Sequence, residues 1–211
     1  LFVNIFENVD FHNVAMMHNK KSINCHVNRC YLSLVYKSVM DIRFKHPLTC
    51  QIAGPSWCGK SVFTFRLIRE INELITPVPE KIIYCYGEYQ PLFNDYPQVT
   101  FREGLPNNDE FDGKHRTLLI LDDLMTEAGD GVSNLFTKIS HHRNVSVIFL
   151  TQNFYHKSKQ ARTMSLNTEY LVLFKNPRDA TQVATLGRQM YPHNSKFLIE
   201  AFKDATKRSY G

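Results

Sequence analysis

The sequence predicts an α/β fold with a mostly parallel sheet that is covered by helices on both faces. Three unbroken apolar runs, at 117–124, 145–153 and 170–177, have the composition of strands buried on both faces, and helical segments alternate with them. A shorter strand at 48–54 ends in a glycine-rich loop that opens a helix, as phosphate-binding loops do. The 211 residues suffice for one sizeable domain of this kind.

A helical pattern follows the first strand. Residues 60–75 place five apolar side chains at helical spacing, and the sequence PVPE ends that helix. These side chains are Val62, Phe65, Ile68, Ile71 and Ile75. The remaining elements are predicted as a strand at 81–87, a short edge strand at 99–104, a polar loop at 106–114, and helices at 131–142, 178–190 and 194–206.

One polar residue interrupts the pattern of apolar strands. Gln51 lies inside the first strand, which belongs in the centre of the sheet. A buried amide must find a hydrogen-bond partner there or face a side of the sheet that water reaches. We expect one of these two arrangements.

Composition excludes several classes of protein. With 43% hydrophobic and 21% charged residues, the chain resembles ordinary soluble globular proteins. No apolar run approaches the roughly 20 residues of a membrane span, so no membrane partner is expected. The first residues, LFVNIFENVD, lack the basic segment of a signal peptide. The chain begins without Met, which indicates a fragment or an excised domain.

The cysteines indicate reduced thiols. Cys50, Cys58 and Cys85 fall in or beside apolar runs, which is typical of buried thiols in an intracellular protein. The sequence CHVNRC at 25–30 has residue types that bind zinc, but no second ligand pair follows at finger spacing. Ordinary packing is therefore the favoured interpretation of that stretch.

Charge is unevenly distributed along the chain. Residues 138–211 contain 12 Lys and Arg against 4 Asp and Glu, a net charge of +8, whereas residues 1–137 contain 13 against 16, a net charge of −3. A basic C-terminal third of this kind either contacts the phosphate backbone of a nucleic acid or forms a solvated surface, and charge alone leaves both interpretations open.

The sequence GPSWCGKS at 54–61 fits the eight-position pattern of a phosphate-binding loop, with Gly54, Gly59, Lys60 and Ser61 at the required places. Backbone N–H groups of such a loop point at the β-phosphate, and the following helix adds the positive end of its dipole. Lys60 would bridge the β- and γ-phosphates of a nucleotide, and the Ser61 hydroxyl would hold Mg²⁺. The four intervening residues line the loop; they are Pro55, Ser56, Trp57 and Cys58.

Trp57 is the unusual residue of this loop, because small residues fit there more easily. Only backbone atoms are needed at its position, so an outward side chain is tolerable. If the position requires a positive φ, a bulky residue costs about 1 kcal/mol or more. A tolerated outward side chain is favoured over the alternative, in which Trp57 stacks on a base or a partner.

Polar residues end two of the apolar strands. Asp122 and Asp123 lie at the tip of the sequence LLILDD, and Gln152 lies at the tip of the next strand. Ligands bind at the carboxyl edge of open α/β sheets. Asp122 is predicted to hold Mg²⁺ or its water, Asp123 to orient or deprotonate the attacking water, and Gln152 to reach the γ-phosphate. Strands that merely end in polar residues are the alternative.

Arg143 precedes the strand at 145–153 and is either an arginine finger or a surface arginine near a helix C-terminus. Its position places it near the amino edge of the sheet, away from its own nucleotide. As a finger, it could reach an ATP only across the interface of a closed ring of subunits.

Four stretches together carry a resemblance to a known family. They are AGPSWCGKS, LLILDDLMTEAGDGVSNLFTKISHHRNVSVIFLTQN, SLNTEYLVLFKNPRD and RQMYP. Residues 46–211 resemble the genome-packaging ATPases of Polinton/Maverick elements and related eukaryotic DNA viruses, which form the poxvirus-type branch of the FtsK–HerA superfamily. Residues 1–45 match nothing and are interpreted as an N-terminal extension of unknown structure.

The resemblance implies a P-loop NTPase fold with strand order 5-1-4-3-2, in which the strand ending at Gln152 separates the Gly54 strand from the Asp122 strand. It implies a homo-oligomeric ring of ATPases that uses ATP and Mg²⁺ to translocate double-stranded DNA into a capsid. A capsid protein is a candidate partner, and the host nucleus or a viral assembly site is the expected location. The resemblance assigns the roles given above to Lys60, Ser61, Asp122, Asp123, Gln152 and Arg143.

Three departures from the family pattern bear on activity. Trp57 and Cys58 replace small residues, Asp123 stands where many relatives in the wider superfamily have Glu, and the chain stops at KRSYG, about where one more strand would begin. The loop and the early stop indicate a truncated or decaying copy of the ATPase domain at 46–211. Two other functions therefore remain open: a viral replicative P-loop helicase, and a degenerate, non-catalytic nucleotide-binding module.

Overall fold

The computed structural model describes residues 14–18, 43–124, 129–154, 159–176, 178 and 181–206. The strands are β1 (Val14–His18), β2 (Phe44–Lys45), β3 (Thr49–Ala53), β4 (Ile75–Thr76), β5 (Lys81–Tyr86), β6 (Thr100–Glu103), β7 (Thr117–Asp122), β8 (Val145–Thr151) and β9 (Tyr170–Phe174). The main helices are α2 (Lys60–Arg69), α3 (Ile71–Leu74), α4 (Gly129–Asn134), α5 (Ser140–His142), α6 (Lys159–Asn167), α7 (Thr181–Met190) and α8 (Ser195–Ala205), and a π-helical turn, η3 (Leu135–Ile139), joins α4 to α5.

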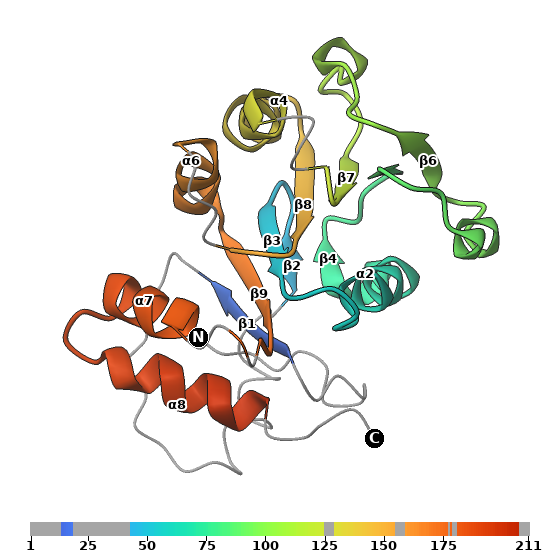
Figure 1. The fold of residues 1–211 in the computed structure, drawn as a ribbon. Coiled ribbons are helices and arrows are strands. Elements are labelled where there is room, and N and C mark those ends of the chain that lie inside the picture. The colour runs from blue at the N-terminus through green and yellow to red at the C-terminus, as the bar shows by residue number, and fades with distance from the viewer. Residues whose placement is uncertain are drawn as a thin grey trace.

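The main sheet has the order β1-β9-β3-β8-β7-β5-β6 (Figure 1). The six strands from β9 to β6 are parallel, and β1 pairs antiparallel with β9 at one edge. When β3, β5, β7, β8 and β9 are numbered 1 to 5, their spatial order is 5-1-4-3-2, so the predicted order is confirmed. In particular, β8 separates the loop-bearing strand β3 from β7.

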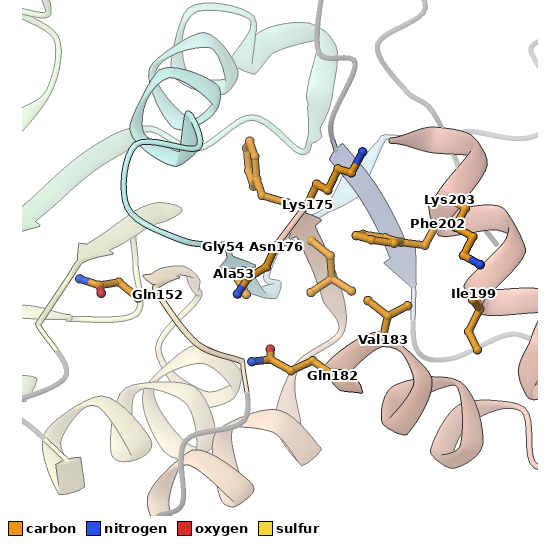
Figure 2. Close-up of a pocket in the computed structure, with 12 residues that line it drawn as sticks. Ala53, Gly54, Gln152, Lys175, Asn176, Gln182, Val183, Ile199, Phe202 and Lys203 are labelled. Atoms are coloured by element: carbon orange, nitrogen blue, oxygen red, sulfur yellow. The ribbon is translucent and has the colours of Figure 1, made fainter. Parts of the chain in front are cut away.

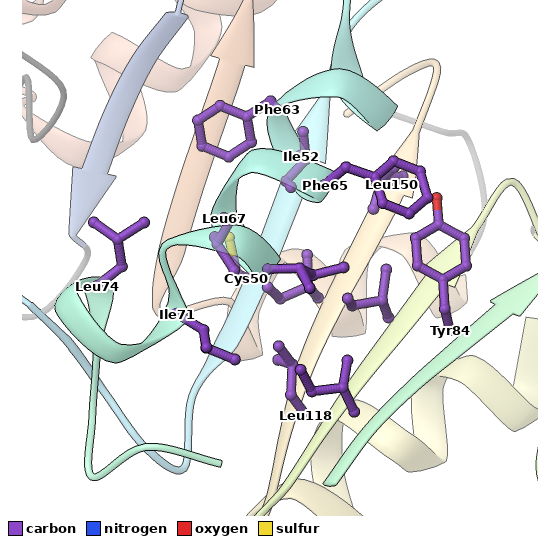
Figure 3. Close-up of a cluster of buried hydrophobic side chains, with 14 of the residues drawn as sticks. Cys50, Ile52, Phe63, Phe65, Leu67, Ile71, Leu74, Tyr84, Leu118 and Leu150 are labelled. Atoms are coloured by element: carbon purple, nitrogen blue, oxygen red, sulfur yellow. The ribbon is translucent and has the colours of Figure 1, made fainter. Parts of the chain in front are cut away.

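Helices cover both faces of the sheet, as predicted. Helices α2 and α3 pack on one face, and their apolar residues form one core with alternate residues of β3, β5, β7, β8 and β9 (Figure 3). On the opposite face, α4, η3 and α6 pack over β7 and β8, and α7 and α8 pack over β9 (Figure 1). Strand β7 shows why both layers form: Leu118 and Ile120 join the first core, and Leu119 and Leu121 join the second.

Several elements differ from the sequence prediction. The helix predicted at 60–75 is divided into two helices, since α2 stops at Arg69 and α3 follows it. The last predicted residue, Ile75, belongs instead to β4, which pairs with β2 in a small separate sheet. Strand β1 and helix α6 were not predicted; β1 is held by backbone pairing with β9, and α6 has too few apolar residues for a clear helical period. The CHVNRC stretch lies outside the described residues.

The side-chain oxygen of Gln51 has neither of the two arrangements that its sequence position predicts. Its side chain is buried at 2% exposure between Phe149 and Leu171 in the register of the sheet. Its oxygen Oε1 has no hydrogen-bond partner among the residues that the structure describes. An unpaired buried polar atom of this kind costs about 1–3 kcal/mol.

Replacing Gln51 by methionine is therefore expected to raise the free energy of unfolding by about 1 kcal/mol, since methionine has a similar shape and no unpaired oxygen. Thermal or urea unfolding measures this change. Thr49→Val is the matched control on the same strand, because the Thr49 hydroxyl donates to Asn167 O and accepts the Glu169 N–H, and its loss should lower stability. A Gln51→Met protein less stable than wild type would contradict the prediction.

Candidate functional site

The phosphate loop connects β3 to α2 at the carboxyl edge of the sheet. Gly59 has φ 99° and directly precedes the first residue of α2. Gly54 is required for space, because an added Cβ would lie 2.5 Å from Cβ of Phe174 and 2.8 Å from Sγ of Cys58. Space at Gly54 and the positive φ at Gly59 therefore explain why glycine occupies both positions. The predicted strand–loop–helix context of the motif is confirmed.

Lys60 folds back over this loop. Its ammonium group donates to the carbonyl oxygens of Gly54 at 2.8 Å and of Pro55 at 2.9 Å. Phosphate oxygens of a nucleotide would replace these carbonyls as the stronger, charged partners.

Trp57 is fully exposed, at 103% relative accessibility, and has φ 64°. The structure thus confirms the expected outward side chain. It also meets the condition for strain, because a residue with a Cβ adopts this left-handed backbone at a cost of about 1 kcal/mol.

We expect Trp57→Gly to bind ATP–Mg²⁺ at least as tightly as wild type, because glycine relieves the backbone strain and the loop uses only backbone atoms there. Trp57→Ala separates the effect of the indole from the effect of backbone strain, since it removes the indole and keeps the strain. Calorimetric titration of both variants measures the effect. Clearly weaker binding by Trp57→Gly would show that the indole makes a useful contact.

Asp122 ends β7 on the face covered by α2. The two-residue period of the strand places it with Leu118 and Ile120, and its carboxylate interacts with the hydroxyl of Ser61 at the start of the helix. Burial raises the pKa of Asp122, and hydrogen bonds from Tyr84 and Ser61 partly oppose that rise. A half-buried carboxylate beside a hydroxyl provides oxygen ligands of the kind that Mg²⁺ takes, so the predicted metal ligands fit that ion.

Tyr84 belongs to this group, although sequence reasoning did not find it. Its ring is fully buried and stacks on Phe65 of α2 at 5.3 Å between centroids (Figure 3). Its hydroxyl donates to Oδ2 of Asp122 at 2.6 Å. Burial, together with the negative charge of Asp122, raises the pKa of Tyr84 above its ordinary value, so the hydroxyl stays a donor. The apolar core thus fixes the tyrosine hydroxyl that holds Oδ2 of Asp122.

Asp123 and Gln152 meet at the tips of β7 and β8. Asp123 has φ 54°, a left-handed turn that Asp tolerates better than most residues, and it leaves the strand directly after Asp122. Nε2 of Gln152 donates to Oδ2 of Asp123 at 3.0 Å. Both side chains are exposed at the carboxyl edge. The Asp123 carboxylate can accept a hydrogen bond from a water molecule here, and the second N–H of the Gln152 amide can donate to that water or to a phosphate oxygen.

Arg143 lies at the amino edge of the sheet, as its place in the sequence predicts. The neighbouring Asn144 accepts the N–H of Thr117, the first residue of β7. The Arg143 guanidinium donates to the carbonyl of Phe111 at 2.8 Å, and the residue is otherwise exposed. The structure therefore does not bring Arg143 to the other site residues of its own chain. Arg178 follows β9, and its backbone N–H donates to the side-chain oxygen of Asn176.

A second kind of metal site is not found in the described part of the chain. Among those residues, no group of three or more His, Cys, Asp or Glu side chains could hold a metal ion. Cys50 and Cys85 are buried free thiols and Cys58 is a half-buried one, so disulfides do not contribute there. No helix in the described ranges is long and apolar enough to cross a membrane.

Strand order, the loop between β3 and α2, and the acids that end β7 define this fold as that of a P-loop NTPase. No protein-family model and no curated protein matches the sequence.

Distant similarity to solved structures is found for about three quarters of the chain. The cytoplasmic domain of EssC is 12% identical, with 76% of this chain and 45% of that chain covered and a TM-score of 0.47. EccC ATPases 2 and 3 of Thermomonospora curvata, in complex with a signal sequence peptide, are 14% identical, with 78% and 43% covered and a TM-score of 0.44. The ATPase DotB of Legionella pneumophila is 12% identical, with 74% and 42% covered and a TM-score of 0.38. The chain spans less than half the length of each, and at these values the similarity assigns it no activity or partner.

Proposed function

We propose that this chain is an ATP-hydrolysing motor domain that translocates double-stranded DNA into a viral capsid. The observation that carries the ATPase activity is the gathering of five predicted residues at the carboxyl edge of adjacent strands and the start of α2: Lys60, Ser61, Asp122, Asp123 and Gln152. The packaging role is supported by the resemblance of residues 46–211 to packaging ATPases and by the basic C-terminal third.

Binding would begin at the phosphate loop. Backbone N–H groups between Gly54 and Ser61 and the N-terminal end of α2 attract the β-phosphate, and Lys60 exchanges its two carbonyl partners for phosphate oxygens. The Ser61 hydroxyl and Asp122 would hold Mg²⁺. When bound, this ion neutralises charge on the β- and γ-phosphates.

Hydrolysis would use the pair at the strand tips. Asp123 orients a water molecule whose oxygen attacks the γ-phosphorus, and the bond to the β–γ bridging oxygen breaks, releasing ADP and phosphate. Gln152 donates to Asp123 and would reach the γ-phosphate, so it can report the state of the nucleotide to β8. The Asp123–Gln152 contact holds the carboxylate in place before the nucleotide binds.

A homo-oligomeric ring, a capsid protein as partner, and action in the host nucleus or a viral assembly site are further parts of this proposal. The ring is supported by Arg143, whose place at the amino edge suits a role towards a neighbouring subunit. A replicative helicase would share the ATPase chemistry but open duplexes, and a non-catalytic module would bind nucleotide without turnover.

Measuring ATP hydrolysis with and without double-stranded DNA tests the proposal most directly. We expect DNA to stimulate turnover, Lys60→Ala to abolish it, and duplex DNA to remain unopened. Strand separation would favour the helicase. Nucleotide binding without turnover, with or without DNA, would favour the non-catalytic module.

DNA binding through the basic segment should depend steeply on salt. Contacts to the phosphate backbone release counterions, so affinity should fall on the order of a hundredfold or more between about 50 and 200 mM salt, with little difference between unrelated duplexes. Fluorescence anisotropy measures both properties. Reversing the exposed charges of Arg188 and Lys196 should weaken binding, whereas Lys114→Glu, outside the segment, should not. Salt-insensitive binding, or none at low salt, would contradict the motor.

A further inference from the structure

A cavity of about 220 Å³ opens directly beside the phosphate loop (Figure 2). It lies between the carboxyl ends of β3 and β9 on one side and helices α7 and α8 on the other, and it reaches Gly54 and Gln152. Pockets that enclose whole drug-sized ligands have roughly 300–1,000 Å³. This cavity therefore suits one part of a nucleotide rather than all of it.

The arrangement of the strands indicates which part of a nucleotide the cavity would hold. The groups that would surround the γ-phosphate, on β7 and β8, all lie on one side of β3. Strand β9 borders β3 on the other side. A nucleotide with its phosphates in the loop and its γ-phosphate beside Asp123 and Gln152 therefore directs its nucleoside towards β9, where the cavity opens.

The walls of the cavity match the faces of a planar ring. They are predominantly apolar and include Leu173, Phe174, Val183, Ile199 and Phe202. In Figure 2 the side chains of Val183 and Phe202 point into the same space. Aromatic and aliphatic side chains hold a nucleobase by its π-faces, an interaction that tolerates any base of suitable size.

Polar groups line the mouth of the cavity. The amides of Asn176 and Gln182 face the space between them in Figure 2. Asn176 is oriented by the N–H of Arg178, which donates to its Oδ1, and Gln182 donates to Oδ1 of Asn153 at 2.7 Å. Amides offer both donors and acceptors to the edge of a base. Lys203 adds a positive charge at the rim, on the side of α8.

We propose that this cavity is the base subsite of the nucleotide site and takes the purine ring of a nucleoside triphosphate. The inference rests on the proposed binding of nucleotide phosphates by the loop. Phe202 and Ile199 of α8 and Val183 of α7 pack against the ring, and the amides of Asn176 and Gln182 contact its edge. Trp57, which points to solvent on the loop, takes no part in this contact.

Calorimetric titration with two probes, ATP–Mg²⁺ and inorganic triphosphate–Mg²⁺, separates the base from the phosphates. Wild-type protein should bind ATP more tightly than triphosphate by at least roughly tenfold, the scale of one base–aromatic contact. Phe202→Ala should remove most of this difference by weakening ATP alone. Val183→Phe, which fills the cavity, should do the same. Lys60→Ala should weaken both probes.

Phe197→Ala is the matched control, because Phe197 lies on the same helix and is exposed, with its ring against Tyr191. It should leave both affinities unchanged, and thermal unfolding checks that each variant is folded. Equal affinity of wild type for ATP and triphosphate, or unchanged ATP binding in both cavity variants, would overturn the base subsite and leave the loop as a phosphate site. No binding of either probe by wild type would overturn the proposed function and the subsite with it.

Discussion

Asp123→Asn is expected to keep the affinity for ATP–Mg²⁺ and to lower kcat by roughly a hundredfold or more. The substitution removes the negative charge that orients the attacking water, and general-base and water-positioning groups contribute about 10²–10⁴ in rate. An asparagine can still accept the hydrogen bond that Gln152 donates, so the local geometry should persist. Single-turnover hydrolysis and calorimetric binding measure the two effects separately.

Asp122→Asn should behave differently, although the two residues are adjacent. Asp122 is half-buried, contacts Ser61 and accepts the Tyr84 hydroxyl, so it belongs to the metal side of the site. Its replacement should weaken Mg²⁺-dependent nucleotide binding as well as turnover. Asp112→Asn, an exposed aspartate in the loop at 106–114, is the matched control and should change neither. Equal, small effects from Asp122 and Asp123 would mean that both acids merely end a strand.

Arg143→Ala should bind ATP normally and hydrolyse it about 10³–10⁵ times more slowly, which is the effect of an arginine finger in well-studied phosphoryl transfer. The residue lies at the amino edge of its own sheet, so this loss would come from the neighbouring active site in a ring. Thermal unfolding must be measured beside turnover, because the guanidinium also holds the carbonyl of Phe111. A loss of stability that accounts for the loss of turnover would assign Arg143 a structural role.

Mixing two inactive variants tests the assignment to a neighbouring subunit. Lys60→Ala has a defective loop and an intact arginine, whereas Arg143→Ala has an intact loop and no arginine. Mixed rings contain interfaces where an intact loop meets an intact arginine, so part of the activity should return. Light scattering must show that both variants enter one ring. No recovery in such mixed rings would overturn the trans role.

Local sequence was sufficient for the phosphate loop and for the main strands. The spacing from Gly54 to Ser61 depends on neighbouring residues only, and continuous apolar runs identify buried parallel strands without knowledge of their partners. The same logic placed Asp122, Asp123 and Gln152 at one edge, because parallel strands end together. Strand order itself came from the resemblance to packaging ATPases, since β-pairing between distant segments leaves little mark on a single sequence.

Only the tertiary structure decided what depends on contacts between distant segments. In the sequence, Tyr84 has the pattern of an ordinary strand residue. Its role is apparent only in the structure, where its hydroxyl donates to the carboxylate of Asp122, 38 residues away in the sequence. Strand β1 joins the sheet through backbone pairing, which composition does not encode. The cavity beside Gly54 exists because α7 and α8 pack against β9. That the Gln51 oxygen has no partner among the described residues is likewise known only once its neighbours are placed. Local pattern determines which residues can do chemistry, whereas packing determines which of them meet.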